Sequence, residues 1–106
     1  MSEGALHVVE IFLPLNDNQG ARFGAELFGK VRGELVERFG GLTAFTRSPA
    51  EGLWQDEGEV TRDEIVIFEV MAEEIDRGWW ADYRRQLEEL FAQDAVVVRA
   101  RKIELL

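Results

Sequence analysis

Two periodicities meet in residues 5–41, which read "ALHVVEIFLPLNDNQGARFGAELFGKVRGELVERFGG". The first ten residues of this stretch are rich in β-branched and aromatic side chains and end at Pro14, which predicts a β-strand. The turn formers of "LNDNQG" predict a loop. Apolar residues then recur at helical spacing until Gly40-Gly41, so the pattern predicts a helix over residues 22–39.

The remaining segments continue this alternation. "LTAFTR" (42–47) and "EIVIFEV" (64–70) are the second and third predicted strands. A second helix follows, with Asp76 or a neighbour as its N-cap. Its apolar face is formed by Trp79, Tyr83, Leu87 and Leu90. "AVVVRA" (95–100) is the fourth predicted strand, and the terminal "KIELL" is a candidate extension of it.

The order β-α-β-β-α-β is that of the ferredoxin-like fold. We therefore predict an α+β protein with a four-stranded antiparallel sheet and two helices on one face. A length of 106 residues suits a single domain over residues 1–106.

Four features of the sequence carry a family resemblance. They are the segment "ERFGGLTAF" (37–45), a Gly-x-Trp turn at Gly52 and Trp54, an acid-rich hairpin, and a late helix before a Val-rich strand. Over residues 35–100 the chain resembles small bacterial domains of unknown function. Its layout is similar to that of dimeric α+β-barrel proteins and PII-type signalling proteins. The resemblance implies the ferredoxin-like fold and no assigned chemistry.

The net charge of −9 is concentrated in one part of the chain. Residues 51–77 hold ten acidic residues and two arginines, a net charge of −8. Such a patch repels polyanions, so we expect neither nucleic acid nor an anionic membrane as partner, whereas a basic protein is compatible. No cysteine, membrane-spanning run or signal peptide is present, so we expect a cytoplasmic protein without thiolate or zinc-finger chemistry.

The sheet face that the helices leave open is predicted to be apolar. In a strand with one solvated face, the residues on that face are mostly polar, whereas both faces of these strands are mainly apolar. The residues expected to be exposed there are Val8, Phe12, Ile65, Ile67 and Val97. A contiguous apolar patch marks an interface, so we predict a homodimer or higher homo-oligomer that packs through this open face.

Charged residues interrupt the same face. Strand one is expected between strands three and four, which would bring Glu10 near Arg99; Glu69 and Arg47 are expected nearby. Three interpretations stay open. The charges form ion pairs that set the strand register, or they line a small polar pocket in which an acid transfers a proton, or a strand bulge reverses the faces.

Few other residues have catalytic character. His7 is the single histidine, and Ser2 and Ser48 do not complete a catalytic triad with it. The catalytic candidates are therefore His7, Glu10, Glu69 and Arg99. No glycine-rich phosphate loop is present, and the acidic loop lacks EF-hand spacing, so we predict neither a cofactor nor a metal site.

Aromatic residues of the second predicted helix have two interpretations. Trp79 and Trp80 either cover the core, or Trp80 and Arg84 border a pocket for an aromatic or cationic ligand. The ligand-binding candidates are Trp80, Tyr83, Arg84 and Arg47. In the first predicted helix, Gly29 and Gly33 lie on the outward side, which is either a tolerated cost or a close approach by another backbone.

Two classes of function follow. The first is a binding module whose acidic segment, residues 48–63, faces a basic partner. PII-type proteins place their partner-binding loop at the same position, between strands two and three. Its partner-binding candidates are Glu51, Trp54, Asp56, Glu57 and Glu59. The second is a cofactor-free enzyme of the dimeric α+β-barrel kind, of oxygenase or isomerase type, with a pocket between sheet and helices.

Overall fold

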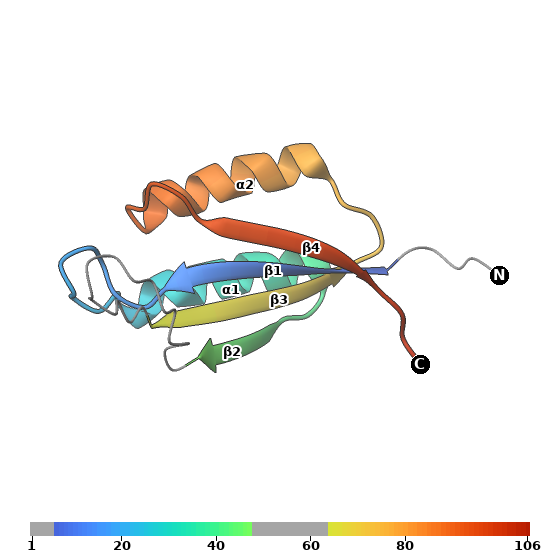
Figure 1. The fold of residues 1–106 in the computed structure, drawn as a ribbon, viewed down its shortest axis with the longest axis horizontal. Coiled ribbons are helices and arrows are strands. Elements are labelled where there is room, and N and C mark those ends of the chain that lie inside the picture. Colours follow the sequence, from blue (N-terminus) through green and yellow to red (C-terminus); the bar gives the residue numbers. More distant parts are fainter. Residues whose placement is uncertain (1–5, 48–63) are drawn as a thin grey trace, which may run out of the picture.

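The computed structural model describes residues 6–47 and 64–106, and these form the predicted α+β architecture (Figure 1). The elements in chain order are β1 (Leu6–Pro14), α1 (Ala25–Phe39), β2 (Thr43–Arg47), β3 (Ile65–Ala72), α2 (Arg77–Leu90) and β4 (Val97–Ile103). The strands form one sheet in the order β2-β3-β1-β4, and every neighbouring pair is antiparallel. This is the ferredoxin-like arrangement, so the predicted fold is confirmed.

The core lies between the sheet and the two helices. In β1 the side chains of Val9, Ile11 and Leu13 are at most 1% exposed, as expected for the strand face that the helices cover. Helix α1 contributes Phe28, Val31 and Leu35 to this core, and α2 contributes Trp80, Tyr83 and Leu87. The helical spacing of these residues, read from the sequence, therefore identifies the buried faces.

Three predicted boundaries are wrong by two or three residues, and one of them is the end of β3, which lies at Ala72 and not at residue 70. Helix α1 starts at Ala25 and not at residue 22, because the preceding backbone is held extended. The Phe23 N–H donates to the Leu15 carbonyl at 3.0 Å, and Asn16 pairs with Arg22 in an isolated bridge. Strand β4 begins two residues later than predicted and continues through part of the terminal "KIELL" segment, where its residues pair with β1.

Both helix termini that the sequence identifies are present. The Asp76 carboxylate accepts a hydrogen bond from the Trp79 N–H at 3.0 Å, which caps the start of α2. Helix α1 ends at Gly40, whose φ of 80° is left-handed and whose N–H donates to the Val36 carbonyl at 2.8 Å. Glycine adopts this conformation without steric cost, which explains the stop.

An aromatic cluster joins the end of α1 to the start of α2. Trp80 stacks on Phe39 at 5.3 Å, and Trp79 stacks on Tyr83 at 4.8 Å. The Arg38 guanidinium lies 4.1 Å from the centre of the Trp79 ring. The interpretation that the two tryptophans cover the core is confirmed, since Trp80 is 7% exposed and Trp79 packs against the buried cluster.

Replacing both outward-facing glycines of α1, Gly29→Ala and Gly33→Ala, should stabilise the chain. A Cβ at either position would meet nothing within 4 Å in a single chain, so only the lower helix propensity of glycine remains. We expect a gain of about 0.5–1 kcal/mol in the free energy of unfolding for each substitution, measured by thermal or urea denaturation. Lower stability together with a change in sedimentation would instead indicate that a second chain approaches α1 closely.

Candidate functional site

A cluster of charged side chains occupies the open face of the sheet. The carboxylate of Glu10, with a side chain 12% exposed, accepts hydrogen bonds from Arg99 Nε at 3.0 Å and Arg101 Nη1 at 3.2 Å. The Arg99 guanidinium also lies 4.7 Å from the centre of the Phe12 ring. The predicted contact between Glu10 and Arg99 is therefore present, and no strand bulge reverses the faces.

The register of the strands places a second acidic residue in this cluster. Glu69 of β3 is directly opposite Glu10 of β1, and half-buried. Two carboxylates thus lie on neighbouring strands and point from the same face. Among the described residues, arginines contact Glu10 and no ion pair is formed by Glu69. Arg101 is absent from our sequence-based candidates, although it follows Arg99 by two residues and so lies on the same strand face.

His7 does not join this cluster. His7 and Glu10 are separated by an odd number of positions in β1, so the two side chains point to opposite faces of the sheet. Its Nδ1 atom lies 3.2 Å from the Glu73 carbonyl oxygen, at the end of the sheet. The structure thus gathers Glu10, Glu69 and Arg99 but separates His7 from them.

The apolar part of the open face differs from the prediction. Val8 and Ile67 were expected to be exposed, yet each is 4% exposed, because they lie on central strands where neighbouring side chains cover them. Val97 is exposed as predicted, at 56%, and the other exposed apolar side chains of this face are Phe45 and Met71, at 44% and 49%. The strand alternation also places Phe45 and Met71 on this face. The prediction did not include them, because it contained no residue of β2 and none from the end of β3.

The predicted candidates Phe12 and Ile65 lie between these exposed residues and are half-buried. Phe45, Ile67, Phe12 and Val97 form one row across all four strands. We call the exposed and half-buried members of this surface the open-face patch: Phe12, Phe45, Ile65, Met71 and Val97.

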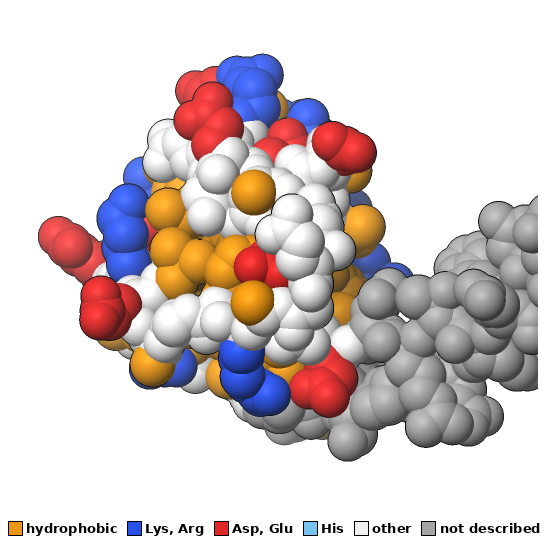
Figure 2. All heavy atoms as spheres, turned by 90° about the vertical axis from the view of Figure 1, so that its left-hand side faces the viewer, with side chains coloured by type: hydrophobic (Ala, Val, Ile, Leu, Met, Phe, Trp, Pro, Cys, Tyr) orange, Lys and Arg blue, Asp and Glu red, His pale blue; other side chains and the backbone are white. Residues whose placement is uncertain are grey.

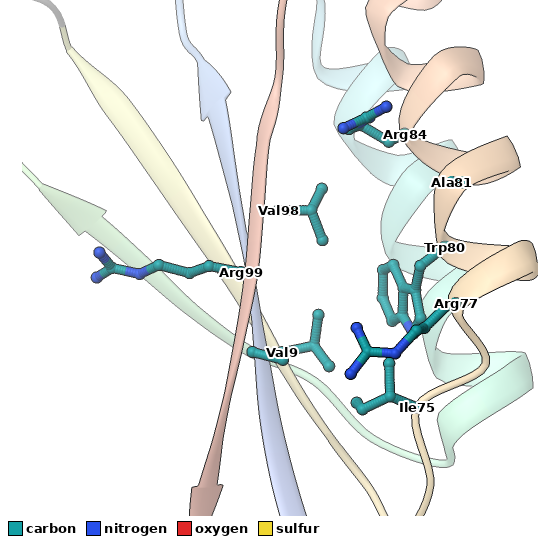
Figure 3. Close-up of a pocket in the computed structure, with 9 residues that line it drawn as sticks. Val9, Ile75, Arg77, Trp80, Ala81, Arg84, Val98 and Arg99 are labelled. Atoms are coloured by element: carbon teal, nitrogen blue, oxygen red, sulfur yellow. The ribbon is translucent and has the colours of Figure 1, made fainter.

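A pocket of about 270 Å³ lies between α2 and the edge strand β4 (Figure 3). Its lining comprises Val9, Ile75, Arg77, Trp80, Ala81, Arg84, Val98, Arg99 and Ala100. The side chain of Arg99 extends away from it to the other face of the sheet, so Arg99 contributes backbone (Figure 3). Two of the predicted ligand-binding residues, Trp80 and Arg84, are thus brought together, and Arg77 is an addition that sequence reasoning missed.

Tyr83, a third candidate, does not line this pocket. It is 5% exposed, and its hydroxyl donates to Glu34 Oε1 at 3.0 Å, across to helix α1. Burial, and then the neighbouring Glu34 carboxylate, raise the pKa of Tyr83 well above its usual value near 10. The residue therefore links the two helices as a neutral phenol.

This shift predicts a loss of stability at alkaline pH. Above about pH 10 the Tyr83 phenol of the unfolded chain ionises while that of the folded chain stays protonated. The unfolded state then binds fewer protons, so the free energy of unfolding falls as the pH rises. Because the chain has one tyrosine, phenolate absorbance reports on it alone. Phenolate formation near pH 10 with native circular dichroism would contradict this, and Tyr83→Phe is the matched control.

A larger hollow of about 610 Å³ lies where the β1–α1 loop approaches the start of β4. Figure 2 shows this end of the molecule, with hydrophobic side chains near its middle and an acidic side chain among them. Its polar rim serves the fold, because Asp17 Oδ1 accepts from the Gln19 and Ala21 N–H groups, both at 2.9 Å. Asn18 Nδ2 donates to the Ala92 carbonyl at 3.2 Å and ties the loop to the end of α2.

Several predicted residues lie outside the described part of the chain. These are Glu51, Trp54, Asp56, Glu57 and Glu59, and the side chain of Arg47. Within residues 6–47 and 64–106, no three acidic or histidine side chains are placed to hold a metal ion. Neither helix of this part has the length and apolar composition needed to cross a membrane.

The strand order, the two helices on one face and the sheet register define a ferredoxin-like α+β protein. No family model matches the chain, and no curated protein matches it. Among solved structures it is similar to a phage SAM lyase in complex with S-methyl-5'-thioadenosine, with a TM-score of 0.60 and 20% identity over 96% of this chain and 84% of that chain. A phage SAM lyase in the apo state gives 0.56 and 18%, over 96% and 86%. At these identities the likeness concerns the fold.

Proposed function

We propose that the chain acts as a homo-oligomeric binding module that assembles through the open-face patch. The observation that carries this proposal is the exposure of Phe45, Met71 and Val97 on a sheet face that neither α1 nor α2 covers. Large apolar side chains grouped in this way favour burial against another surface. The arginines bound to Glu10 at the centre of the face give such an interface a fixed register.

Sedimentation velocity at micromolar concentration tests the assembly. We expect the chain to sediment as two or more copies, because burial of Phe45, Met71 and Val97 favours association. A single-chain species across the whole concentration range would refute this proposal.

The acidic segment is the proposed partner-facing element. Residues 51–77 carry most of the net charge, and Trp54 lies within their sequence, a combination that suits a basic protein surface. Variants with Trp54→Ala or with reversed charges at Glu57 and Glu59 should lose basic partners in pull-down experiments. If these variants retain the same proteins as the parent chain, the segment has no such role.

A cofactor-free enzyme is the second candidate function. The fold likeness to phage SAM lyases favours it, as does the placement of Glu10 and Glu69 side by side on the open face. Incubation with S-adenosylmethionine, followed by mass spectrometry for S-methyl-5'-thioadenosine, tests this candidate. A lyase activity requires product formation that Glu10→Gln or Glu69→Gln abolishes, and the absence of product excludes this reaction for the chain.

A further inference from the structure

The pocket between α2 and β4 is lined by arginines and by no acidic residue, in a chain with a net charge of −9. Arg77 and Arg84 are seven residues apart on α2, and Trp80 and Ala81 lie between them on the same helix stripe. At 1.5 Å per residue, the two arginines stand about 10 Å apart along the helix axis. The pocket therefore has a positive group towards each end of its α2 wall.

Neighbouring acids leave much of this positive charge available. Arg77 forms no ion pair with any described acid, and its neighbour Asp76 caps α2 and lies 3.9 Å from Arg38. Arg84 is 3.9 Å from Glu88, a long ion pair, and the same Glu88 oxygen accepts a hydrogen bond from the Val96 N–H. An incoming anion would therefore meet guanidinium groups that the described carboxylates do not saturate.

The remaining lining is apolar and flat. Val9 and Val98 form the sheet side of the pocket, and Ile75 lies at its end near Arg77 (Figure 3). Trp80 is stacked on Phe39 and is held rigid, while part of its indole still borders the pocket. A volume of about 270 Å³ is at the small end of ligand pockets, which favours a compact ligand.

We propose that this pocket binds a small organic anion, with a flat apolar body against Val9, Val98 and Trp80. Its carboxylate or phosphate is held at one end of the pocket by Arg77 or at the other end by Arg84. Of the two ligands expected beside Trp80 and Arg84, aromatic or cationic, the proposal keeps the flat body and assigns it a negative charge, because guanidinium groups and no carboxylates line the pocket. The inference rests on the proposed role as a binding module. It concerns the helix-covered side of the sheet, whereas assembly uses the open-face patch.

Calorimetry with three matched probes tests the inference: 1-naphthoate, 1-naphthyl phosphate and the neutral 1-naphthalenemethanol. Both anions, or one of them, should bind at least about tenfold more tightly than the alcohol, since only an anion forms charge-assisted hydrogen bonds with the guanidinium groups. The tighter anion identifies the headgroup class. Equal binding of all three probes, or no binding of either anion, would overturn the proposal.

Arginine variants locate the site. Arg77→Gln with Arg84→Gln should weaken binding of the anion about tenfold or more and leave the alcohol unchanged. Arg85→Gln is the matched control, because Arg85 lies on the same helix, pairs with Asp82 and does not line the pocket. The amide resonances of Ala81, Val98 and Ala100 should shift during the titration. Anion binding that the double variant retains would contradict the assignment.

Repeating the titration with a chain altered in the open-face patch separates the two proposals. Unchanged anion binding by a chain that no longer self-associates would show that the pocket works without assembly. Loss of anion binding in the arginine variants, with unchanged sedimentation, would show that assembly does not depend on the pocket.

Discussion

Replacing Phe45 and Val97 together by glutamate should abolish the proposed self-association and give a single-chain species. The two side chains stand at opposite ends of one row across the sheet, so both charges would enter any interface formed by the open-face patch. Burying uncompensated carboxylates costs several kcal/mol, which corresponds to about a thousandfold or greater weakening of association. Sedimentation velocity and light scattering measure the change in mass.

Val36→Glu is the matched control for this experiment. Val36 is 43% exposed on α1, close to the exposure of Phe45, but it lies away from the open face. It should leave both the mass and the stability unchanged to within about 0.5 kcal/mol. If Phe45→Glu with Val97→Glu leaves the mass of an assembled parent unchanged, the interface lies elsewhere on the chain.

Phe91→Ala should have the largest effect on stability. Phe91 is 0% exposed at the end of α2, and its ring lies 5.1 Å from that of Phe23 and 5.4 Å from that of Phe28. Truncating a fully buried aromatic side chain costs about 3–5 kcal/mol. Since domains of this size have about 5–15 kcal/mol of stability, we expect the denaturation midpoint to fall by more than about 12 °C.

Leu105→Ala provides the comparison, because Leu105 is 69% exposed and lies beyond β4. It should change the unfolding free energy by less than about 0.5 kcal/mol. A loss below about 1 kcal/mol for Phe91→Ala would mean that the aromatic contacts between Phe23, Phe28 and Phe91 do not hold the end of α2 on the core.

The open face shows why a strand pattern predicts the sheet face to which a side chain points but does not predict how exposed that side chain is. The alternation in β1 and β3 assigns Val8 and Ile67 to the face away from the helices, and the register confirms it. Their burial depends on neighbouring strands, and the two strands beside β1, which are β3 and β4, lie far from it in sequence. Exposure is therefore a property of the assembled sheet, and local sequence carries no signal for it.

In the pocket, too, the sequence pattern predicts part of the arrangement, and packing between elements decides the rest. The helical spacing of Trp80 and Arg84 indicates a shared stripe on α2, but Tyr83 belongs to the buried side of that helix and Arg77 to the pocket. Which residues of a wide aromatic stripe reach a pocket depends on how the helix is rotated against the sheet. That rotation is set by packing between elements, here by Phe39 against Trp80 and by Phe23 and Phe28 against Phe91.

The sequence by itself determined the order of the elements, the caps at Asp76 and Gly40, and the proximity of Glu10 to Arg99, because each follows from local periodicity, turn chemistry or the strand order of a known layout. Only the tertiary structure decided that Phe45 and Met71 are exposed, that Arg101 completes the charge cluster, and that Arg77 joins Arg84 beside Trp80. These features depend on contacts between segments far apart in the chain, which form when the sheet and the helices pack together.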